Sequence, residues 1–127
     1  MTVFGILAVG SLDTETTTIE VHEKPVSYTL SADQLFSDYA ANEVAADQKY
    51  KGQVVVVTGQ IDSIGKDITD EAFVVIGGSG FLDGVQCMFV KSQETAVAGV
   101  SKGQVVTIKG EVGGKMGNVL LNNCTFQ

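Results

Sequence analysis

Residues that could carry out chemistry are few in this chain of 127 residues, and their spacing assigns them no reaction. There is a single histidine, His22, and no Ser-His-Asp arrangement or cluster of metal ligands can be built around it. Asp67, Asp70 and Glu71 lie close together, but their spacing differs from that of an EF-hand loop, whose glycine is also missing. The sequence therefore predicts a protein that is not an enzyme and that holds no metal and no cofactor.

The two cysteines, Cys87 and Cys124, fall in separate predicted strands, with a spacing that does not match a metal site. They are either two small buried apolar side chains or one disulfide, which would need an oxidising compartment. Spacing alone does not decide between these two interpretations.

Acidic residues are concentrated in the first third of the chain, which has a net charge of −7. Residues 1–47 hold eight acids and one base, Lys24, whereas residues 48–127 hold seven of each. The chain has no arginine. A nucleic-acid-binding protein normally presents a basic surface with arginines that grip phosphates. The charge therefore argues against nucleic acid as the main ligand, although a local stripe of lysines remains compatible with it.

The most apolar β-branched stretch, residues 51–64 (KGQVVVVTGQIDSI), recurs as residues 102–115 (KGQVVTIKGEVGGK). Consecutive valines favour a strand, because β-branched side chains suit a pleated surface. Gly59 and Gly110 come late in each copy, where a glycine usually marks a bulge or a bend. Two long strands that bend at glycines are what a small closed barrel needs.

The first ten residues, MTVFGILAVG, are apolar, but a membrane-spanning helix takes about 20 such residues. They also lack the basic start of a signal peptide. We interpret them as an arm that docks on its own barrel or on a neighbouring subunit. Residues 16–22 and 26–30 alternate on either side of Pro25, which predicts an edge β-ribbon. The apolar contact residues of the arm would be Val3, Phe4, Ile6, Leu7 and Val9.

A helix is expected from Ser31 to Lys49, because Ser31 and Gln34 fit a capping box and apolar residues follow at helical spacing. Five strands with a short helix between the third and fourth describe a mainly β OB-fold, a Greek-key barrel in which the first and fourth strands pair. The N-terminal helix would pack on one end of this barrel. The chain then divides into an arm with its ribbon (1–30) and the OB-fold domain with its leading helix (31–127). The strands are expected at 54–64, 72–76, 85–90, 104–112 and 119–126, the short helix at 92–100 with Ser92 as its cap, and a loop at 113–118.

Several segments resemble the tRNA-anti-like family of small OB-fold proteins: SADQLFSDYAANEVAADQKYKGQVVVVTGQIDSIGKD, GVQCMFVK, KGQVVTIKGEV and NVLLNNCTF. The resemblance covers about residues 30–127 and is most specific in the helix signature from Asn42 to Tyr50 and in the two Lys-Gly strands. Many members of the family look like exported bacterial lipoproteins and others are phage-encoded, whereas this chain has no lipid-attachment cysteine. The family often has cysteine at the positions of Cys87 and Cys124. Strands three and five are neighbours in an OB barrel, so the resemblance implies that a bridge is geometrically feasible.

OB-folds bind ligands across the second and third strands and the adjacent loops, using aromatic side chains and cations. Each candidate contact also has a structural interpretation, since Phe73 and Phe89 alternate as core residues and nearby acids balance the lysines. Those acids are Asp67, Asp70 and Glu71. The candidate ligand contacts are Lys66, Phe73, Phe81, Met88, Lys91 and Lys115.

The function favoured by these observations is protein–protein interaction or assembly through the N-terminal arm, with a protein partner or further copies of the chain. A structural subunit of a virion or of a bacterial envelope would fit it. The alternative is binding of single-stranded nucleic acid or an oligonucleotide on the OB face, which the charge argues against. No membrane span is predicted.

Overall fold

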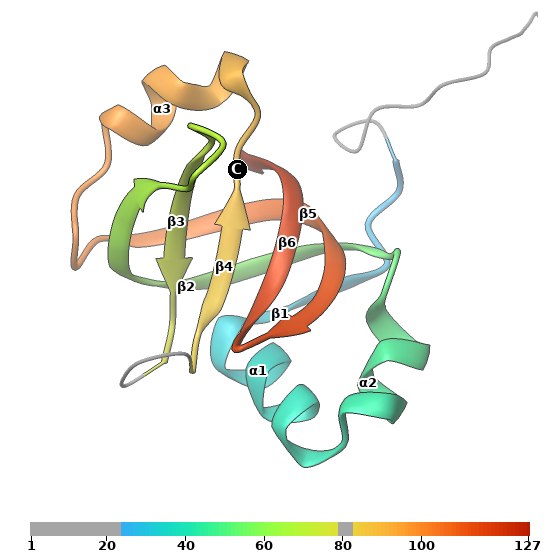
Figure 1. The fold of residues 1–127 in the computed structure, drawn as a ribbon. Helices are drawn as coiled ribbons and strands as arrows, with labels where there is room; N and C mark the ends of the chain where they lie inside the picture. The colour runs from blue at the N-terminus through green and yellow to red at the C-terminus, as the bar shows by residue number, and fades with distance from the viewer. Residues whose placement is uncertain (1–23, 79–82) are drawn as a thin grey trace, which may run out of the picture.

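The part of the chain that the structure describes, residues 24–78 and 83–127 of a computed structural model, contains six strands in one sheet (Figure 1). The strand order is β1-β2-β3-β4-β6-β5, and a further pairing of β2 with β5 closes β2 to β6 into a barrel. This is the mainly β, five-stranded barrel that the sequence predicts. The strands are β1 Tyr28–Ser31, β2 Val54–Lys66, β3 Ala72–Ile76, β4 Val85–Met88, β5 Val105–Met116 and β6 Asn118–Phe126.

The two Lys-Gly stretches lie side by side as the antiparallel pair of β2 and β5, with Val55 opposite Gly110 and Gly59 opposite Val106. The register between β5 and β6 shifts at Gly110, so this glycine does mark a bulge. The pairing of β2 with β5 continues without a bulge at Gly59. Glycine is needed there because neighbouring residues leave no room for a side chain. A Cβ added to Gly59 would lie 3.0 Å from the Cβ of Ala32.

Alternate residues of every barrel strand point inward and form one core. Phe89, just beyond β4, is fully buried and stacks on Phe126 with ring centroids 4.8 Å apart. Val54, Val55 and Val57 are all buried, so the start of β2 is covered on both of its faces.

The helix expected from Ser31 to Lys49 is in fact two helices, α1 Ala32–Ala41 and α2 Glu43–Tyr50. Ser31 caps α1 by accepting a hydrogen bond from the Gln34 amide, as predicted. The helix is interrupted at Asn42. The backbone of this residue is extended, and its side chain accepts a hydrogen bond from the amide of Ala45. The prediction of one helix was wrong because an asparagine that can cap a second helix competes with continuing the first.

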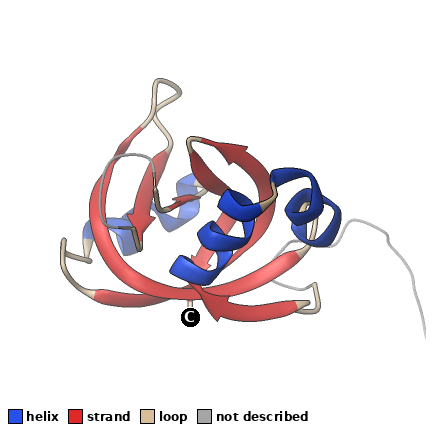
Figure 2. Cartoon of the chain, turned by 90° about the horizontal axis from the view of Figure 1, so that it is seen from below, coloured by secondary structure: helices blue, strands red, loops and turns tan. Residues whose placement is uncertain are grey.

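Two tyrosine–aspartate hydrogen bonds cross the break between α1 and α2. The Tyr39 hydroxyl donates to Asp47 at 2.8 Å, and the Tyr50 hydroxyl donates to Asp38 at 2.5 Å. Burial, followed by these hydrogen bonds, raises the pKa of both phenols, which therefore remain protonated donors. Seen from its end of the barrel, α1 lies across the opening (Figure 2). The helix signature from Asn42 to Tyr50 thus has a structural role: it fixes the angle between two helices that close the barrel.

Several element ends differ from the predicted ones. The chain enters α3 Glu94–Ala98 through a 3-10 turn at Lys91–Gln93, and neither segment has a side-chain cap, so the expected cap by Ser92 is absent. The loop expected over residues 113–118 belongs mostly to strands, because β5 continues to Met116 and β6 begins at Asn118. A positive φ at Gly117 allows this tight turn.

β1 is the described part of the predicted ribbon, and it pairs in parallel with β2. The predicted boundary between residues 30 and 31 falls within this strand. Residues 16–22, expected to form the other half of the ribbon, and the five arm residues lie outside the described residues.

Replacing Gly110 by alanine should destabilise the barrel, because the new Cβ would lie 2.7 Å from Sγ of Cys124 and 3.2 Å from the Asn122 carbonyl oxygen. Overpacking of this kind costs about 1–3 kcal/mol. Gly99→Ala is the matched control, since its nearest neighbour would be 3.5 Å away, and it should change the free energy of unfolding by less than about 0.5 kcal/mol. Urea unfolding of both variants measures the difference, and equal effects would contradict the packing argument.

Candidate binding face of the barrel

The strands β3, β4 and β6 contain no charged residue. Phe73 lies opposite Met88 and Val75 opposite Gln86, and Gln86 lies opposite Leu120 on the other side. The residues next to them in each strand point into the core, so these side chains lie on the outside of the three strands. We call this surface the uncharged face; its residues are Phe73, Val75, Gln86, Met88 and Leu120.

Phe73 belongs to this face and not to the core. The interpretation of Phe73 as a core residue, based on the alternation of its strand, was therefore wrong. Its ring covers Gly65 of β2, where an added Cβ would lie 3.0 Å from the ring. Phe89, by contrast, is fully buried in the core, as expected. Met88 is only 6% exposed, and its sulfur accepts a hydrogen bond from the side chain of Gln86. Phe73 is therefore a more accessible apolar contact than Met88.

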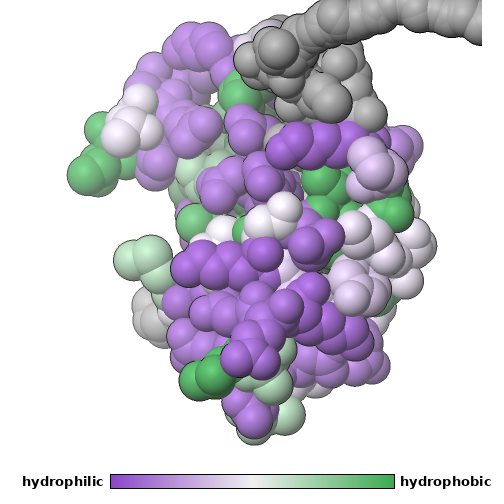
Figure 3. All heavy atoms as spheres, turned by 90° about the vertical axis from the view of Figure 1, so that its right-hand side faces the viewer, coloured by the Kyte–Doolittle hydropathy of each residue, from purple (hydrophilic) through white to green (hydrophobic). Residues whose placement is uncertain are grey.

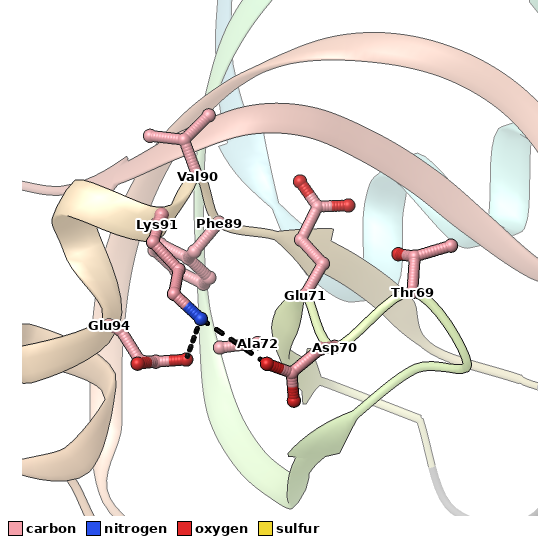
Figure 4. A pocket seen from close by; sticks show the side chains of 8 residues that line it. All are labelled: Thr69, Asp70, Glu71, Ala72, Phe89, Val90, Lys91 and Glu94. Carbon is pink, nitrogen blue, oxygen red and sulfur yellow. Dashed lines mark hydrogen bonds and ion pairs between the residues drawn. The ribbon is translucent and has the colours of Figure 1, made fainter.

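Lys66 and Lys91 are joined to two carboxylates in a closed ring of four ion pairs. Nζ of Lys66 lies 3.1 Å from Asp70 and 2.9 Å from Glu94, and Nζ of Lys91 lies 3.2 Å from Asp70 and 3.7 Å from Glu94. Figure 4 shows Lys91 reaching from the α3 side to the loop between β2 and β3. We call these four residues the ion-pair ring. Both candidate lysines on this side are thus neutralised within the chain.

The ring keeps its charges at neutral pH. Hydrogen bonds from Lys66 and Lys91 lower the pKa of Asp70, and a hydrogen bond from Lys66 lowers the pKa of Glu94. The same contacts, with Glu94 first and Asp70 second, raise the pKa of Lys66. An incoming phosphate would have to compete with these carboxylates for the lysines.

The loop between β2 and β3 (residues 67–71) is held in one conformation by Asp67. This carboxylate accepts hydrogen bonds from the amide and the hydroxyl of Thr69 and from the amide of Glu71. The hydroxyl contact is the first cause of the lowered pKa of Asp67. Asp70 adopts a positive φ of 67°, so its side chain turns back toward the lysines of the ring. The loop is acidic, as expected, but it is tied down by its own side chains.

The six candidate ligand contacts do not form one site. Lys66 and Lys91 lie beside α3, whereas Lys115 lies at the α1 end, with Nζ 5.7 Å from the ring centroid of Phe36. Phe81 lies outside the described residues.

The face that carries α2 is mainly hydrophilic, with apolar residues in separate spots (Figure 3).

Sequence reasoning missed Glu94 as a partner of the lysines. The acids expected to balance them were Asp67, Asp70 and Glu71, but Asp67 binds its own loop and the second partner is Glu94. A usable signal was present, because Glu94 follows Lys91 by three residues at the start of a predicted helix. Its contact with Lys66 depends on the packing of α3 against β3.

Next to the ring is a cavity of about 360 Å³ with Ala72 and Phe89 among its lining residues. Acidic groups outnumber basic ones there, because the lining includes Asp70, Glu71 and Glu94 but only one lysine, Lys91 (Figure 4). This balance does not favour an anionic ligand.

Cys87 in β4 and Cys124 in β6 are fully buried free thiols. Burial, and then a hydrogen bond with Cys87, raise the pKa of the Cys124 thiol well above its ordinary value. The thiolate form, which reacts with oxidants and alkylating reagents, is therefore disfavoured in the folded chain. A disulfide between the two residues stays a prediction.

No three metal-ligating side chains come together within residues 24–78 and 83–127. No helix in these ranges is long and apolar enough to cross a membrane.

A closed five-stranded barrel with a short helix between its third and fourth strands defines this protein as an OB-like binding module. The chain belongs to the tRNA_anti-like family, whose sequence model matches residues 2–125. The match starts well before residue 30, so it includes most of the N-terminal segment that the resemblance left out.

The chain is similar to two solved structures, of which the first supports the same fold. A "putative nucleic acid-binding lipoprotein" from Klebsiella pneumoniae subsp. pneumoniae has a TM-score of 0.66 and 24% identity, over 78% of this chain and 90% of that chain. An OBody bound to hen egg-white lysozyme has a TM-score of 0.48 and 21% identity, over 61% of this chain and 84% of that chain. No curated protein matches the chain.

Lys91→Met should raise the pKa values of Asp70 and Glu94 toward their ordinary values, because each carboxylate loses a cation. Since the folded-state pKa values are lowered, the ring stabilises the fold above the unfolded-state pKa of about 4. This contribution is lost as the pH falls through the folded-state values. NMR titration of the carboxyl carbons measures the shifts, with Lys102→Met as a control outside the ring. Unchanged titration in Lys91→Met would contradict the ring.

Cys87 and Cys124 are expected to lie within reach of a bridge, and a bridge in the chain purified without reductant would be seen as an intact mass lower by two hydrogens. In the chain-entropy model its reduction would lower the free energy of unfolding by about 3–4 kcal/mol. Both cysteines labelling fully after unfolding without reductant would rule the bridge out.

Proposed function

We propose that this protein is a non-enzymatic OB-fold module whose main ligand is protein, bound chiefly through the N-terminal arm. The observation that carries the proposal is the ion-pair ring, which neutralises both candidate lysines beside α3. The uncharged face adds no cation, so the part of the barrel where OB-folds meet their ligands has little to hold a phosphate backbone.

Two lysines elsewhere in the described ranges also have partners within the chain. Nζ of Lys24 lies 3.7 Å from Glu111, and Nζ of Lys49 lies 5.3 Å and 5.0 Å from the ring centroids of Tyr28 and Tyr50. Such exposed contacts are individually weak. These contacts occupy two further lysines of the described ranges, which supports a protein ligand over a polyanion.

The arm is the second support for a protein ligand. Residues 1–10 are almost wholly apolar, and apolar side chains gain free energy when a partner surface covers them. An assembly role, as a structural subunit of a virion or a bacterial envelope, follows from this reading. The family and the lipoprotein name of the Klebsiella protein are compatible with an envelope location.

Single-stranded nucleic acid is the second candidate ligand. The name of the Klebsiella protein favours it, as does the partly exposed Phe73 ring, on which a base could stack. A stacking contact alone, without phosphate contacts, would give weak binding with little dependence on salt.

Deleting residues 1–12 should abolish assembly of the purified chain while leaving the barrel folded, because the described core uses no residue before 28. Sedimentation velocity measures the assembly and circular dichroism measures the fold. The full chain should show no strong binding of a single-stranded oligonucleotide at about 150 mM salt, measured by fluorescence anisotropy. Tight, salt-sensitive oligonucleotide binding that survives the deletion would place nucleic acid first.

A further inference from the structure

One row of paired residues crosses four neighbouring strands of the barrel without a charged side chain. Each member lies opposite the next, and the members are Ser63 of β2, Val75 of β3, Gln86 of β4 and Leu120 of β6. All four are partly exposed, and Phe73 and Met88 of the uncharged face lie beside them. The strands β3, β4 and β6 lie side by side on one wall of the barrel (Figure 1). Three strand spacings make the row about 14 Å long.

Such a row favours a ligand segment that is itself apolar and uncharged. A charged side chain laid on it would lose water without gaining a partner of opposite charge. Residues 1–10 of this chain are almost wholly apolar and contain no Asp, Glu, Lys, Arg or His. Residues 3–9 in an extended conformation span about 20 Å, because each residue adds about 3.3 Å, so they are long enough to cross the row.

The place where the described chain begins lies near the β6 end of this row. Nζ of Lys24 lies 3.7 Å from Glu111 of β5, and Glu111 lies opposite Asn122 of β6. Leu120 is two residues from Asn122, about 7 Å along the strand. Residues 11–23 join this place to the arm and can span about 43 Å when fully extended. The linker is therefore several times longer than the path to the chain's own row.

The length and the charge of residues 11–23 favour the row of a second copy over the chain's own row. A contact within one chain weakens when its linker is much longer than the gap, because the effective concentration falls. Residues 11–23 have no lysine or arginine, and a linker of like charges repels itself and extends. Their acids are Asp13, Glu15, Glu20 and Glu23.

We propose that the arm of one copy lies across the uncharged face of a second copy, and that the second copy's arm lies on the face of the first. Each chain carries both halves of this contact, so two copies satisfy each other about a two-fold axis. The inference rests on the proposed function, since it names the surface that the arm binds. It also assigns a role to the uncharged face, which is to bury an apolar segment.

The test compares full-length variants by sedimentation velocity over a range of concentrations. The wild type should form a reversible dimer. The arm variant, Ile6→Asp with Leu7→Asp, puts a carboxylate on each side of an extended arm. It should weaken dimerisation by about a hundredfold or more, because two contacts are lost per dimer and each is worth roughly tenfold or more. The face variant, Val75→Lys, should do the same. Val105→Lys is the matched control, since Val105 is 66% exposed on β5 and outside the row, and it should dimerise like the wild type.

A mixture of the arm variant and the face variant provides a stricter test. The first keeps an intact face and the second keeps an intact arm, so a mixed dimer held by one contact should form although neither variant dimerises alone. Its formation would also show that both variants are folded. Leu120→Lys repeats the face substitution on another strand.

Three results would overturn the proposal. They are a wild type that stays monomeric, as an arm docked on its own face would give, face variants that dimerise like the wild type, and a mixture that forms no dimer. A dimer that survives the arm variant contradicts the proposed function as well. A dimer that is lost in the arm variant but survives both face variants contradicts this inference alone.

Discussion

The pairing of β2 with β5 is the constraint on which the rest of the structure depends. Without it the sheet would end at β5 on one side and expose long edges, which attract other chains. To close the sheet, β2 pairs with both β3 and β5, and β5 pairs with both β2 and β6, with a bulge at Gly110 between β5 and β6. Closure also encloses the core: once the ring of strands is complete, alternate side chains have only one interior to fill.

The helices depend on that closure, because they pack on the open end that it creates. Leu35 and Tyr39 of α1 enter the core cluster, and Tyr50 of α2 joins them after the break at Asn42. The crossed tyrosine–aspartate hydrogen bonds satisfy polar groups at this junction, where an unpaired hydroxyl would be costly. Within the helix signature, Asn42, Asp47 and Tyr50 therefore use their polar groups to hold the helix pair together.

Charge distribution links the fold to the proposed function. The loops of an OB-fold usually surround its ligand, and here the β2–β3 loop and α3 bring opposite charges together instead of exposing cations. The result is a barrel with an uncharged face and a neutral ring on a chain that is acidic overall. Such a surface suits a protein ligand, because contact then depends on apolar burial and shape, not on the release of counterions.

The sequence by itself indicated the five barrel strands, through valine-rich runs and glycine positions, and the pairing of the two Lys-Gly strands followed from the OB-fold that this order of elements describes. It also determined the Ser31 cap, which needs only residues three apart. Only the tertiary structure decided that Asn42 ends one helix and caps the next, that Phe73 faces outward, and that Glu94 closes the ion-pair ring. The last two of these outcomes depend on contacts between residues distant in sequence: α3 must pack against β3 before Glu94 can reach Lys66, and β2 must place Gly65 under Phe73 before the phenyl ring has room to lie there.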